Sequence, residues 1–307
     1  MNPSRLKAYI LLTIVTIIWA LAEPIIKFTL GGFSPLIFLT YRFGLSSLVA
    51  ITCFVIFGFH FPKDTKTRLE IILYGLVTST FSLGLLFFGL KNTTVLNTLL
   101  ITLMNPLLVS IAGVKFLKEH ITLKEKIGMS IALLGTVLTV VGPFLQDGNS
   151  LTRFSGNVMV FIYLIFATIG VILGKKLLRK DVDPLTLTNS AFIIGFISLL
   201  PFALPQIINS GFRTITSVSF PYHLGVIYMA FLSGTLAYLL SNKAQKTIEV
   251  GEAAVFSYLY PIFATPLAVL WLGEKITPLF IIGGVIIAIG VIVAEIKKKS
   301  VASQSRG

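Results

Sequence analysis

The sequence has little charge and almost no cysteine. Only 12% of the 307 residues are Asp, Glu, Lys or Arg, whereas a soluble globular protein carries about 25%. The single cysteine, Cys53, lies inside an apolar run, which excludes a disulfide framework and gives no sign of a redox site. The composition therefore argues against a water-soluble globule and against a disulfide-stabilised secreted domain.

Sequence motifs that carry enzymatic chemistry are also missing. The histidines His60, His120 and His223 are scattered near the ends of apolar runs, without an H-E-x-x-H motif. No G-x-S-x-G elbow, no P-loop and no pair of aspartates within an apolar run occurs. We therefore predict that the chain is not an enzyme, that it uses no metal or cofactor, and that it does not hydrolyse ATP.

Apolar residues, by contrast, are abundant and come in long blocks. They make up 55% of the chain, and the mean hydropathy is +0.92. Blocks of about 20 residues, at 1.5 Å per residue, are long enough to cross a hydrocarbon core of about 30 Å. We predict an all-α integral membrane protein with ten transmembrane helices, at residues 8–30, 34–58, 69–90, 94–116, 125–144, 156–177, 185–207, 221–242, 250–272 and 277–295.

The first apolar run resembles a signal peptide, because Arg5 and Lys7 precede it and Ala20-Leu21-Ala22 could be cleaved. Pro24 follows that site directly and disfavours cleavage, so we expect the run to be retained as a membrane span. A net charge of +13 is also found in nucleic-acid-binding proteins, but here the basic residues lie in short loops between apolar runs. We therefore predict a lipid bilayer as partner and no nucleic acid.

The distribution of the 25 Lys and Arg residues predicts the orientation. With ten spans, 19 of them fall on the side of the N-terminus, five (Lys27, Lys91, Arg153, Arg213 and Lys275) fall on the other side, and Arg42 lies within a span. Because positive residues accumulate in cytoplasmic loops, both termini are expected in the cytoplasm and the chain in the plasma membrane.

One segment occurs twice, at residues 105–135 and 260–290. Each copy has an apolar run with a proline, a Glu-x-Ile-Thr elbow and a second apolar run that contains glycines. The matched residues are 155 positions apart: Pro106 and Pro261, Glu119 and Glu274, Ile121 and Ile276, Thr122 and Thr277, Gly128 and Gly283, and Gly135 and Gly290. We predict two repeats of five helices, residues 1–146 and 147–307. Five is an odd number, so the second repeat enters the membrane from the opposite side.

Inverted repeats are typical of secondary transporters, whose binding site lies near the bilayer midplane between the repeats. Prolines inside spans fit this expectation, since each removes a backbone hydrogen bond that only protein or a polar cavity can replace. We predict Pro24, Pro106, Pro261 and Pro266 to be hinges or kinks of the transport pathway. A simple packing kink is the alternative at each position.

This arrangement resembles the EamA family of the drug/metabolite transporter superfamily. The resemblance is carried by Pro106, Glu119 and the glycines Gly128 and Gly135 in the first half, and by Pro261, Leu272-Gly273-Glu274, Gly283 and Gly290 in the second. Trp19 on the first span and Arg42-Phe43 on the second are similar to family features. The resemblance implies a ten-span carrier, often an exporter, that moves amino acids or other small metabolites by alternating access through a central cavity.

Two departures from the family pattern bear on the binding site. Ala20-Leu21-Ala22-Glu23-Pro24 follows the tryptophan, where family members often have small or polar residues. Thr168 and Ala191 stand in the second half at the positions aligned with Trp19 and Arg42. We therefore expect an asymmetric substrate site.

Glu23 and Arg42 are the charged residues deepest in the predicted spans. Counted along their helices, both fall about 8–12 Å below the outer surface. A charge that faced lipid there would cost at least about 2–3 kcal/mol, so each side chain should face protein or water. One hypothesis is a structural ion pair, of Glu23 with either Arg42 or Lys27. The other is that Glu23 binds a substrate ammonium or a coupling proton while Arg42 binds a carboxylate, which would suit a zwitterion such as an amino acid.

Other polar residues within spans are candidates for the cavity wall or for helix packing: Trp19, Asn97, Asn105, Tyr163, Tyr238 and Tyr258. Glu119 and Glu274 are expected to be structural, as acceptors for backbone N–H groups at helix starts. Carriers of sugar phosphates, nucleotide sugars or drug-like cations remain alternatives, as does a lipid flippase. Ten spans can enclose a complete pathway, so a monomer would suffice.

Overall fold

The computed structural model describes residues 3–58, 62–118, 123–146 and 151–295, and these residues form helices and turns with no strand among them. Eight of the described helices are long and apolar enough to cross a membrane, and two shorter apolar helices cover Lys126–Gly142 and Pro278–Val293. The chain is therefore an all-α, multi-pass membrane protein of about ten helices, close to the predicted spans.

Helices of the first half follow one another in the order α1 (Pro3–Thr29), α2 (Pro35–Phe57), α3 (Thr65–Gly75), η1 (Leu76–Ser82), α4 (Leu83–Asn92), α5 (Val95–Thr102), α6 (Asn105–Ala112), η2 (Gly113–Leu117) and α7 (Leu123–Gln146). The second half contains α8 (Leu151–Arg179), α9 (Pro184–Asn209), α10 (Arg213–Thr216), α11 (Phe220–Ile227), η3 (Tyr228–Leu236), α12 (Ala237–Gln245), α13 (Val250–Ala254), η4 (Val255–Leu259), α14 (Tyr260–Leu270) and α15 (Pro278–Glu295).

Several of these helices begin where capping residues predict. The Ser34 hydroxyl accepts a hydrogen bond from Ile37 N at 3.4 Å, and the Asp183 carboxylate accepts from Leu185 N at 2.9 Å. A proline, Pro35 or Pro184, follows each cap as the first helical residue, where its fixed backbone angle suits the helix and its missing N–H has no cost. The second span of each predicted half therefore starts in the same way.

The structure differs from the prediction of continuous spans at two matched places. The third and eighth spans each contain a π-helical segment, η1 at Leu76–Ser82 and η3 at Tyr228–Leu236, where the hydrogen-bond pattern widens by one residue. The fourth span is interrupted by a turn at Leu103 and Met104, and the ninth passes through the 3-10 segment η4, so that α6 starts at Asn105 and α14 starts at Tyr260, 155 residues later. We call both places helix breaks. Hydropathy does not register either feature, because the apolar runs continue through them.

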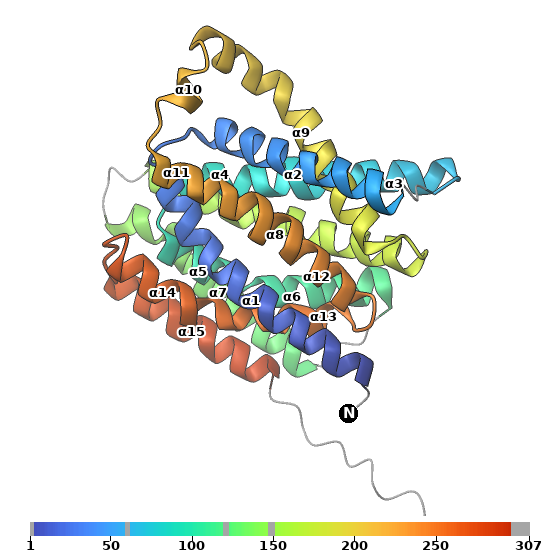
Figure 1. The fold of residues 1–307 in the computed structure, drawn as a ribbon. Coiled ribbons are helices and arrows are strands. Elements are labelled where there is room, and N and C mark those ends of the chain that lie inside the picture. Colours follow the sequence, from blue (N-terminus) through green and yellow to red (C-terminus); the bar gives the residue numbers. More distant parts are fainter. Residues whose placement is uncertain (1–2, 59–61, 119–122, 147–150, 296–307) are drawn as a thin grey trace, which may run out of the picture.

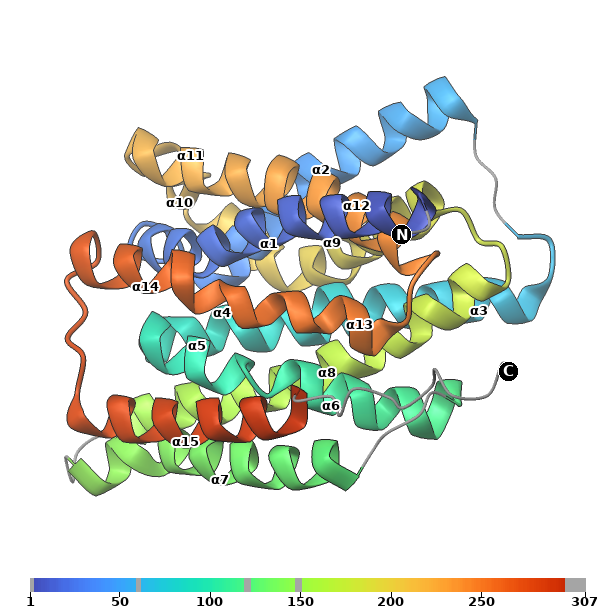
Figure 2. The same cartoon turned by 90° about the horizontal axis from the view of Figure 1, so that it is seen from below.

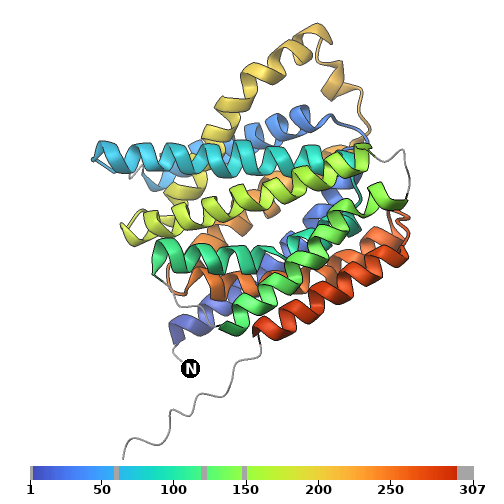
Figure 3. The same ribbon diagram turned by 180° about the vertical axis from the view of Figure 1, so that it is seen from behind.

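The helices pack in pairs that join the two predicted halves (Figure 1). α2 packs on α9, α7 on α15, α4 on α8 and α1 on α12. When the two halves are exchanged, the α2–α9 and α7–α15 contacts map onto themselves, and the α4–α8 contact maps onto the α1–α12 contact. Figure 3, the view from behind, shows α7 and α15 side by side along one edge of the bundle.

The glycines of the sequence repeat lie where α7 and α15 cross. A Cβ atom on Gly290 would lie 2.5 Å from Ala132 N and 2.6 Å from Gly128 O. A Cβ atom on Gly135 would lie 2.9 Å from Gly283 O. Real Cβ atoms do not approach backbone so closely, so these glycines are required for the two helices to touch.

The bundle has two ends, which Figure 2 shows from below. We call the end that holds the N-terminus and the last described residue, Glu295, the terminal side, and the opposite end the far side. The α1–α2, α4–α5 and α14–α15 connections lie on the far side.

One lysine in each half, the half-buried Lys27 and the buried Lys175, ties the first helix of that half to the end of its third span. Lys27 Nζ donates to Leu90 O at 2.7 Å and to Thr93 O at 2.5 Å. Lys175, which is 6% exposed, donates to Gln245 O and to Ile248 O, and these acceptors follow the first pair by 155 residues. Both lysines stabilise carbonyl groups that a helix leaves unbonded at its C-terminus.

Candidate functional site

A cavity of about 180 Å³ lies in the interior of the bundle. It is lined by α1, α2, the third span with η1, α8, the eighth span with η3, and the helix breaks of the fourth and ninth spans. Its polar lining consists of Trp19, Glu23, Arg42, Tyr74, Thr78, Ser82, Thr102, Asn105, Tyr163, Ser233, Tyr238, Ser241, Asn242, Gln245, Ser257 and Tyr260. Both predicted halves contribute side chains.

Glu23 and Arg42 both line this cavity and both are buried, at 7% and 1% exposure. Neither is in an ion pair with any described residue, since the two salt bridges there are Arg5–Glu252 and Lys180–Glu70. Glu23 Oε2 has no hydrogen-bond partner. The hypothesis of a structural pair is therefore wrong for both proposed partners, and Lys27 instead binds the backbone carbonyls at the end of α4.

The Arg42 guanidinium has aromatic neighbours but no hydrogen-bond acceptor among the described residues. Its Cζ lies 5.0 Å from the ring centroid of Phe43 and 5.7 Å from that of Phe87. All three of its nitrogens are buried without a hydrogen bond. A Cβ atom on Gly234 would come within 3.2 Å of Nη2, so the glycine in η3 leaves room for the charged group. A buried cation of this kind is ready to receive an anionic group.

Aromatic side chains form the wall next to the two charges. Trp19 Nε1 donates to Ser233 O at 3.0 Å, and its ring meets Tyr238 edge to face with centroids 5.1 Å apart. The hydrogen bond joins the first span to η3, so it sets the orientation of the indole. Tyr163 from α8 also lines the cavity.

The two helix breaks border the cavity. Asn105 and Tyr260, the first residues of α6 and α14, both line it, and Asn105 Oδ1 has no hydrogen-bond partner. Pro106 and Pro261 come directly after them, in the first turn of each new helix. Pro24 lies inside α1 next to Glu23, and Pro266 lies inside α14.

Two predicted candidates do not reach this cavity. Asn97 lines a separate cavity on the far side, because it precedes the break in the fourth span. Tyr258 lies in η4 and is absent from the lining, while its neighbours Ser257 and Tyr260 are present.

Several lining residues escaped the sequence analysis, among them Tyr74, Thr78, Ser82 and Gln245. Thr78 and Ser82 belong to η1. The run of small hydroxyl residues from Thr78 to Ser82 was the available signal, but such residues also pack between helices.

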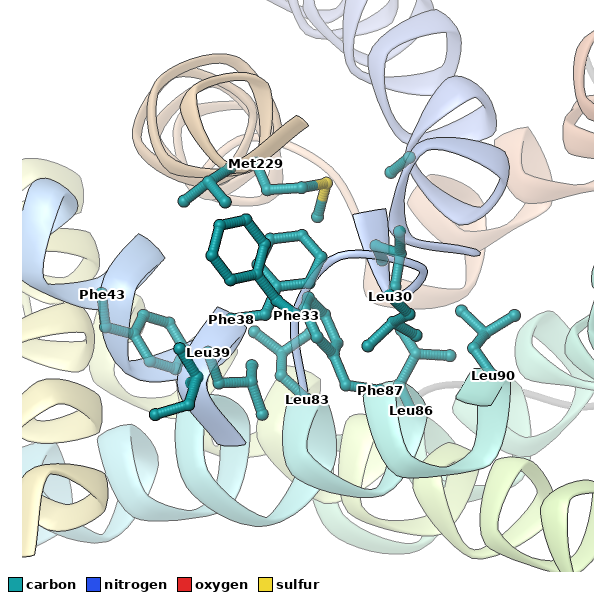
Figure 4. Close-up of a cluster of buried hydrophobic side chains, with 14 of the residues drawn as sticks. Leu30, Phe33, Phe38, Leu39, Phe43, Leu83, Leu86, Phe87, Leu90 and Met229 are labelled. Atoms are coloured by element: carbon teal, nitrogen blue, oxygen red, sulfur yellow. The ribbon is translucent and has the colours of Figure 1, made fainter. Parts of the chain in front are cut away.

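An apolar cluster, shown in Figure 4, borders the cavity and shares Ile26, Leu86 and Met229 with its lining. Phe38 of α2 and Phe87 of α4 meet edge to face at 4.9 Å, and Phe33 packs against Phe38 at 6.4 Å. Leu30 and Leu90 extend the cluster outward. Toward the terminal side, the lining continues instead through Tyr74, Gly174 and Gln245, and the last two lie near the ends of α8 and α12.

Glu274, between α14 and α15, binds the start of α5 in the other half. Its carboxylate oxygens accept from Val95 N at 2.7 Å and from Leu96 N at 2.9 Å. Burial raises the pKa of Glu274 above its ordinary value, although these N–H groups, Lys27 and Arg153 act in the opposite direction. Glu119, its partner in the repeat, lies outside the described residues. Within the described part, no three His, Cys, Asp or Glu side chains gather as a metal site requires.

Comparison with known proteins gives consistent matches over almost the whole chain. The model of the EamA-like transporter family matches residues 6–141 and again residues 154–295. The chain is 28% identical over 293 residues to a protein of Bacillus subtilis (strain 168) named "Uncharacterized transporter YyaM", covering 95% of this chain and 94% of the relative.

A second relative, from Salmonella typhimurium, is named "Probable amino-acid metabolite efflux pump". It is 24% identical over 283 residues, covering 90% of this chain and 91% of the relative. A solved structure described as "Crystal structure of protein" shares the fold, with a TM-score of 0.63 and 17% identity over 96% of this chain and 97% of that one. The relatives are named as transporters, so the chain is a transporter and not an enzyme. The chain belongs to the EamA-like transporter family.

Proposed function

We propose that this chain is a secondary carrier that exports small zwitterions, with amino acids as the first class to test. The observation that carries the proposal is the pair Glu23 and Arg42. The two opposite charges are buried on the same cavity, and neither is neutralised by a described residue. A substrate that carries both an ammonium and a carboxylate would complement them.

The chemistry of each contact follows from the side chain. A guanidinium binds a carboxylate through two parallel N–H···O bonds, and the Arg42 nitrogens have no competing acceptor. The free Glu23 oxygen accepts a hydrogen bond from an ammonium, or holds a proton when the substrate is absent. Sugar phosphates and nucleotide sugars fit less well, because Arg42 is the only cation among the described residues that line the cavity.

The size of the cavity also favours a small metabolite. At about 180 Å³ it is smaller than the roughly 300–1,000 Å³ typical of sites for drug-sized ligands. The name of the Salmonella typhimurium relative is in keeping with an amino-acid substrate and with export.

Alternating access would use the two halves as inverted repeats. The paired packing of helices across the halves, the matched breaks at Asn105 and Tyr260, and the double match to the family model support this arrangement. The Lys and Arg distribution favours both termini in the cytoplasm, with the chain in the plasma membrane. In that orientation the cavity extends toward the cytoplasm, and the apolar cluster of Phe33, Phe38 and Phe87 would be the outer gate. Proton binding at Glu23 would couple export to the proton gradient, and one chain would hold the whole pathway.

Counterflow in proteoliposomes tests the proposal. Vesicles containing the purified chain are loaded with one unlabelled amino acid, and entry of the same labelled amino acid is followed. Transient accumulation with one or a few amino acids is expected, and it requires neither a proton gradient nor a known direction. If a cooperative thermal transition shows that the protein is folded, and no labelled amino acid of the panel accumulates, an amino-acid substrate would be contradicted. The same assay with a drug-like cation, a sugar phosphate and a labelled lipid then identifies the substrate class.

A further inference from the structure

A second cavity, of about 390 Å³, lies on the far side at the end of the α7–α15 pair. Its lining comes from the starts of α5, α8 and α15, from α7, and from the α14–α15 connection: Thr94, Leu96, Asn97, Thr139, Arg153, Gly273, Lys275, Thr277, Leu279 and Phe280. None of these residues lines the central cavity. The second cavity is therefore a separate place, whatever the central cavity transports.

The charged side chains that the structure describes in this cavity are all positive. Among the described lining residues Arg153 and Lys275 are charged and none is acidic, and neither cation takes part in a salt bridge with a described residue. The carboxylate of Glu274 lies within electrostatic reach of Arg153. Both oxygens of Glu274 are already bound to Val95 N and Leu96 N. Its single negative charge is outweighed by the two cations, Arg153 and Lys275, so a net positive field remains.

Backbone groups add to this field. α8 and α15 both begin at the cavity, near Arg153 and Thr277, and each presents the positive end of its helix dipole there. Threonine and asparagine side chains, including Thr94 and Asn97, add hydrogen-bonding groups to the same lining. An anion in this cavity would meet cationic, polar and helix-terminal donors at once.

The surroundings of the cavity indicate where such an anion would come from. Leu96, Leu279 and Phe280 give the lining an apolar part. From its edge, α15 and α7 present large apolar side chains to the outside of the bundle, with Ile281 54% and Leu134 68% exposed. Such side chains contact the acyl chains of the membrane.

We propose that this cavity binds the phosphate group of an anionic phospholipid, with the acyl chains along the exposed faces of α7 and α15. Arg153 and Lys275 bind the phosphate, and Asn97, Thr94 and Thr277 bind its ester oxygens and headgroup hydroxyls. A headgroup that carries an amine binds less well, because its ammonium would face two cations and no free carboxylate. The lipid then fills the junction where the α14–α15 connection meets α5.

Native mass spectrometry of the purified full chain tests this proposal. Phosphatidylglycerol and phosphatidylethanolamine with identical acyl chains are titrated in parallel, and we expect the chain to prefer phosphatidylglycerol. The double substitution Arg153→Gln with Lys275→Gln should weaken phosphatidylglycerol binding about 30-fold and leave phosphatidylethanolamine binding unchanged. The matched control, Lys63→Gln with Lys66→Gln, removes the same charge from exposed residues of the terminal side and should retain the preference.

Competition with glycerol 1-phosphate separates a lipid from a soluble phosphate ester. We expect millimolar glycerol 1-phosphate to leave the lipid bound, because it lacks acyl chains. Displacement at the concentration at which the lipid itself binds would assign the site to a soluble anion and overturn the lipid proposal. Equal binding of both phospholipids by the parent chain, or unchanged binding by the double variant, would overturn the site itself. If the double variant does not fold, the single substitution Lys275→Gln, in an exposed connection, should still lower phosphatidylglycerol affinity about fivefold.

Discussion

Replacing Arg42 by glutamine separates a binding role from a structural role. The guanidinium is 1% exposed, has no hydrogen-bond acceptor and lies over the rings of Phe43 and Phe87. An arginine at the centre of a transmembrane helix costs about 2.5–3.5 kcal/mol, and two cation–π contacts offset about 1–2 kcal/mol of that. Removing the charge from the empty carrier should therefore leave its melting temperature unchanged or raise it by a few degrees.

Transport, in contrast to stability, should be strongly impaired by the same substitution. A substrate carboxylate would lose two charge-assisted hydrogen bonds, each worth about 1.5–3 kcal/mol. The half-saturating concentration in counterflow should rise at least about 100-fold, while Arg42→Lys, which keeps the charge and one bond, should fall between Gln and the parent. Both quantities are measured on purified protein, with counterflow carried out over a range of substrate concentrations.

Arg213→Gln is the matched control, because Arg213 is an exposed cation of the far side that lines neither cavity. If Arg42 instead held the fold together, its substitution would leave a buried group without its partner and cost about 3–5 kcal/mol. A melting temperature lowered by several degrees together with unchanged half-saturation would refute the binding role.

Four further predictions follow from single contacts. Glu23→Gln should abolish most counterflow at every pH while expression stays near that of the parent, and Glu249→Gln, at an exposed glutamate, should transport normally. Normal counterflow by the Glu23 variant would contradict a role of this carboxylate in binding the substrate ammonium. Burial raises the pKa of Glu274, so this residue should stabilise the parent relative to Glu274→Gln most at a pH below the ordinary carboxyl range, and this advantage should fall as pH rises through the raised pKa. A difference in melting temperature between the two proteins that stays constant from pH 4 to 8 would contradict this. Lys175→Met should lower stability by about 1–3 kcal/mol by leaving Gln245 O and Ile248 O without a donor, while Lys176→Met, at the exposed neighbour, should be nearly neutral in the same thermal assay. Gly290→Ala should destabilise the chain by about 1–3 kcal/mol because its Cβ would meet Ala132 backbone at 2.5 Å, whereas Gly284→Ala, whose Cβ would meet only a leucine methyl at 3.4 Å, should melt with the parent.

The transport class and the helical membrane fold could be predicted before any coordinates. Apolar runs of about 20 residues leave few alternatives to transmembrane helices, because backbone groups in lipid must bond within their own segment. The positions of the prolines and glycines in the repeat also indicated where helices break and where they cross. Pro106 and Pro261 proved to follow matched helix breaks, and Gly135 and Gly290 proved to lie where α7 and α15 cross.

The candidate site was predicted less completely than the fold. Trp19, Glu23, Arg42, Asn105, Tyr163 and Tyr238 do line one cavity, but Asn97 lies in another. Asn97 and Asn105 belong to the same apolar run, and the break at Leu103 and Met104 separates their surroundings. Depth in the membrane can be counted along the chain, whereas the direction in which a side chain points depends on local helix geometry that hydropathy does not report.

The sequence alone determines the number and length of the apolar runs and the repeat spacing of 155 residues. It also shows two charged residues within these runs, Glu23 and Arg42, which cannot face lipid. Which residues meet across the interior follows only from the folded chain. Lys175 rather than its neighbour Lys176 binds the end of α12, and Glu274 binds the start of α5, about 180 positions away. The physical reason is that such contacts join segments remote in the chain, and that π-helical turns and helix breaks rotate side chains by amounts that the pattern of apolar residues does not encode.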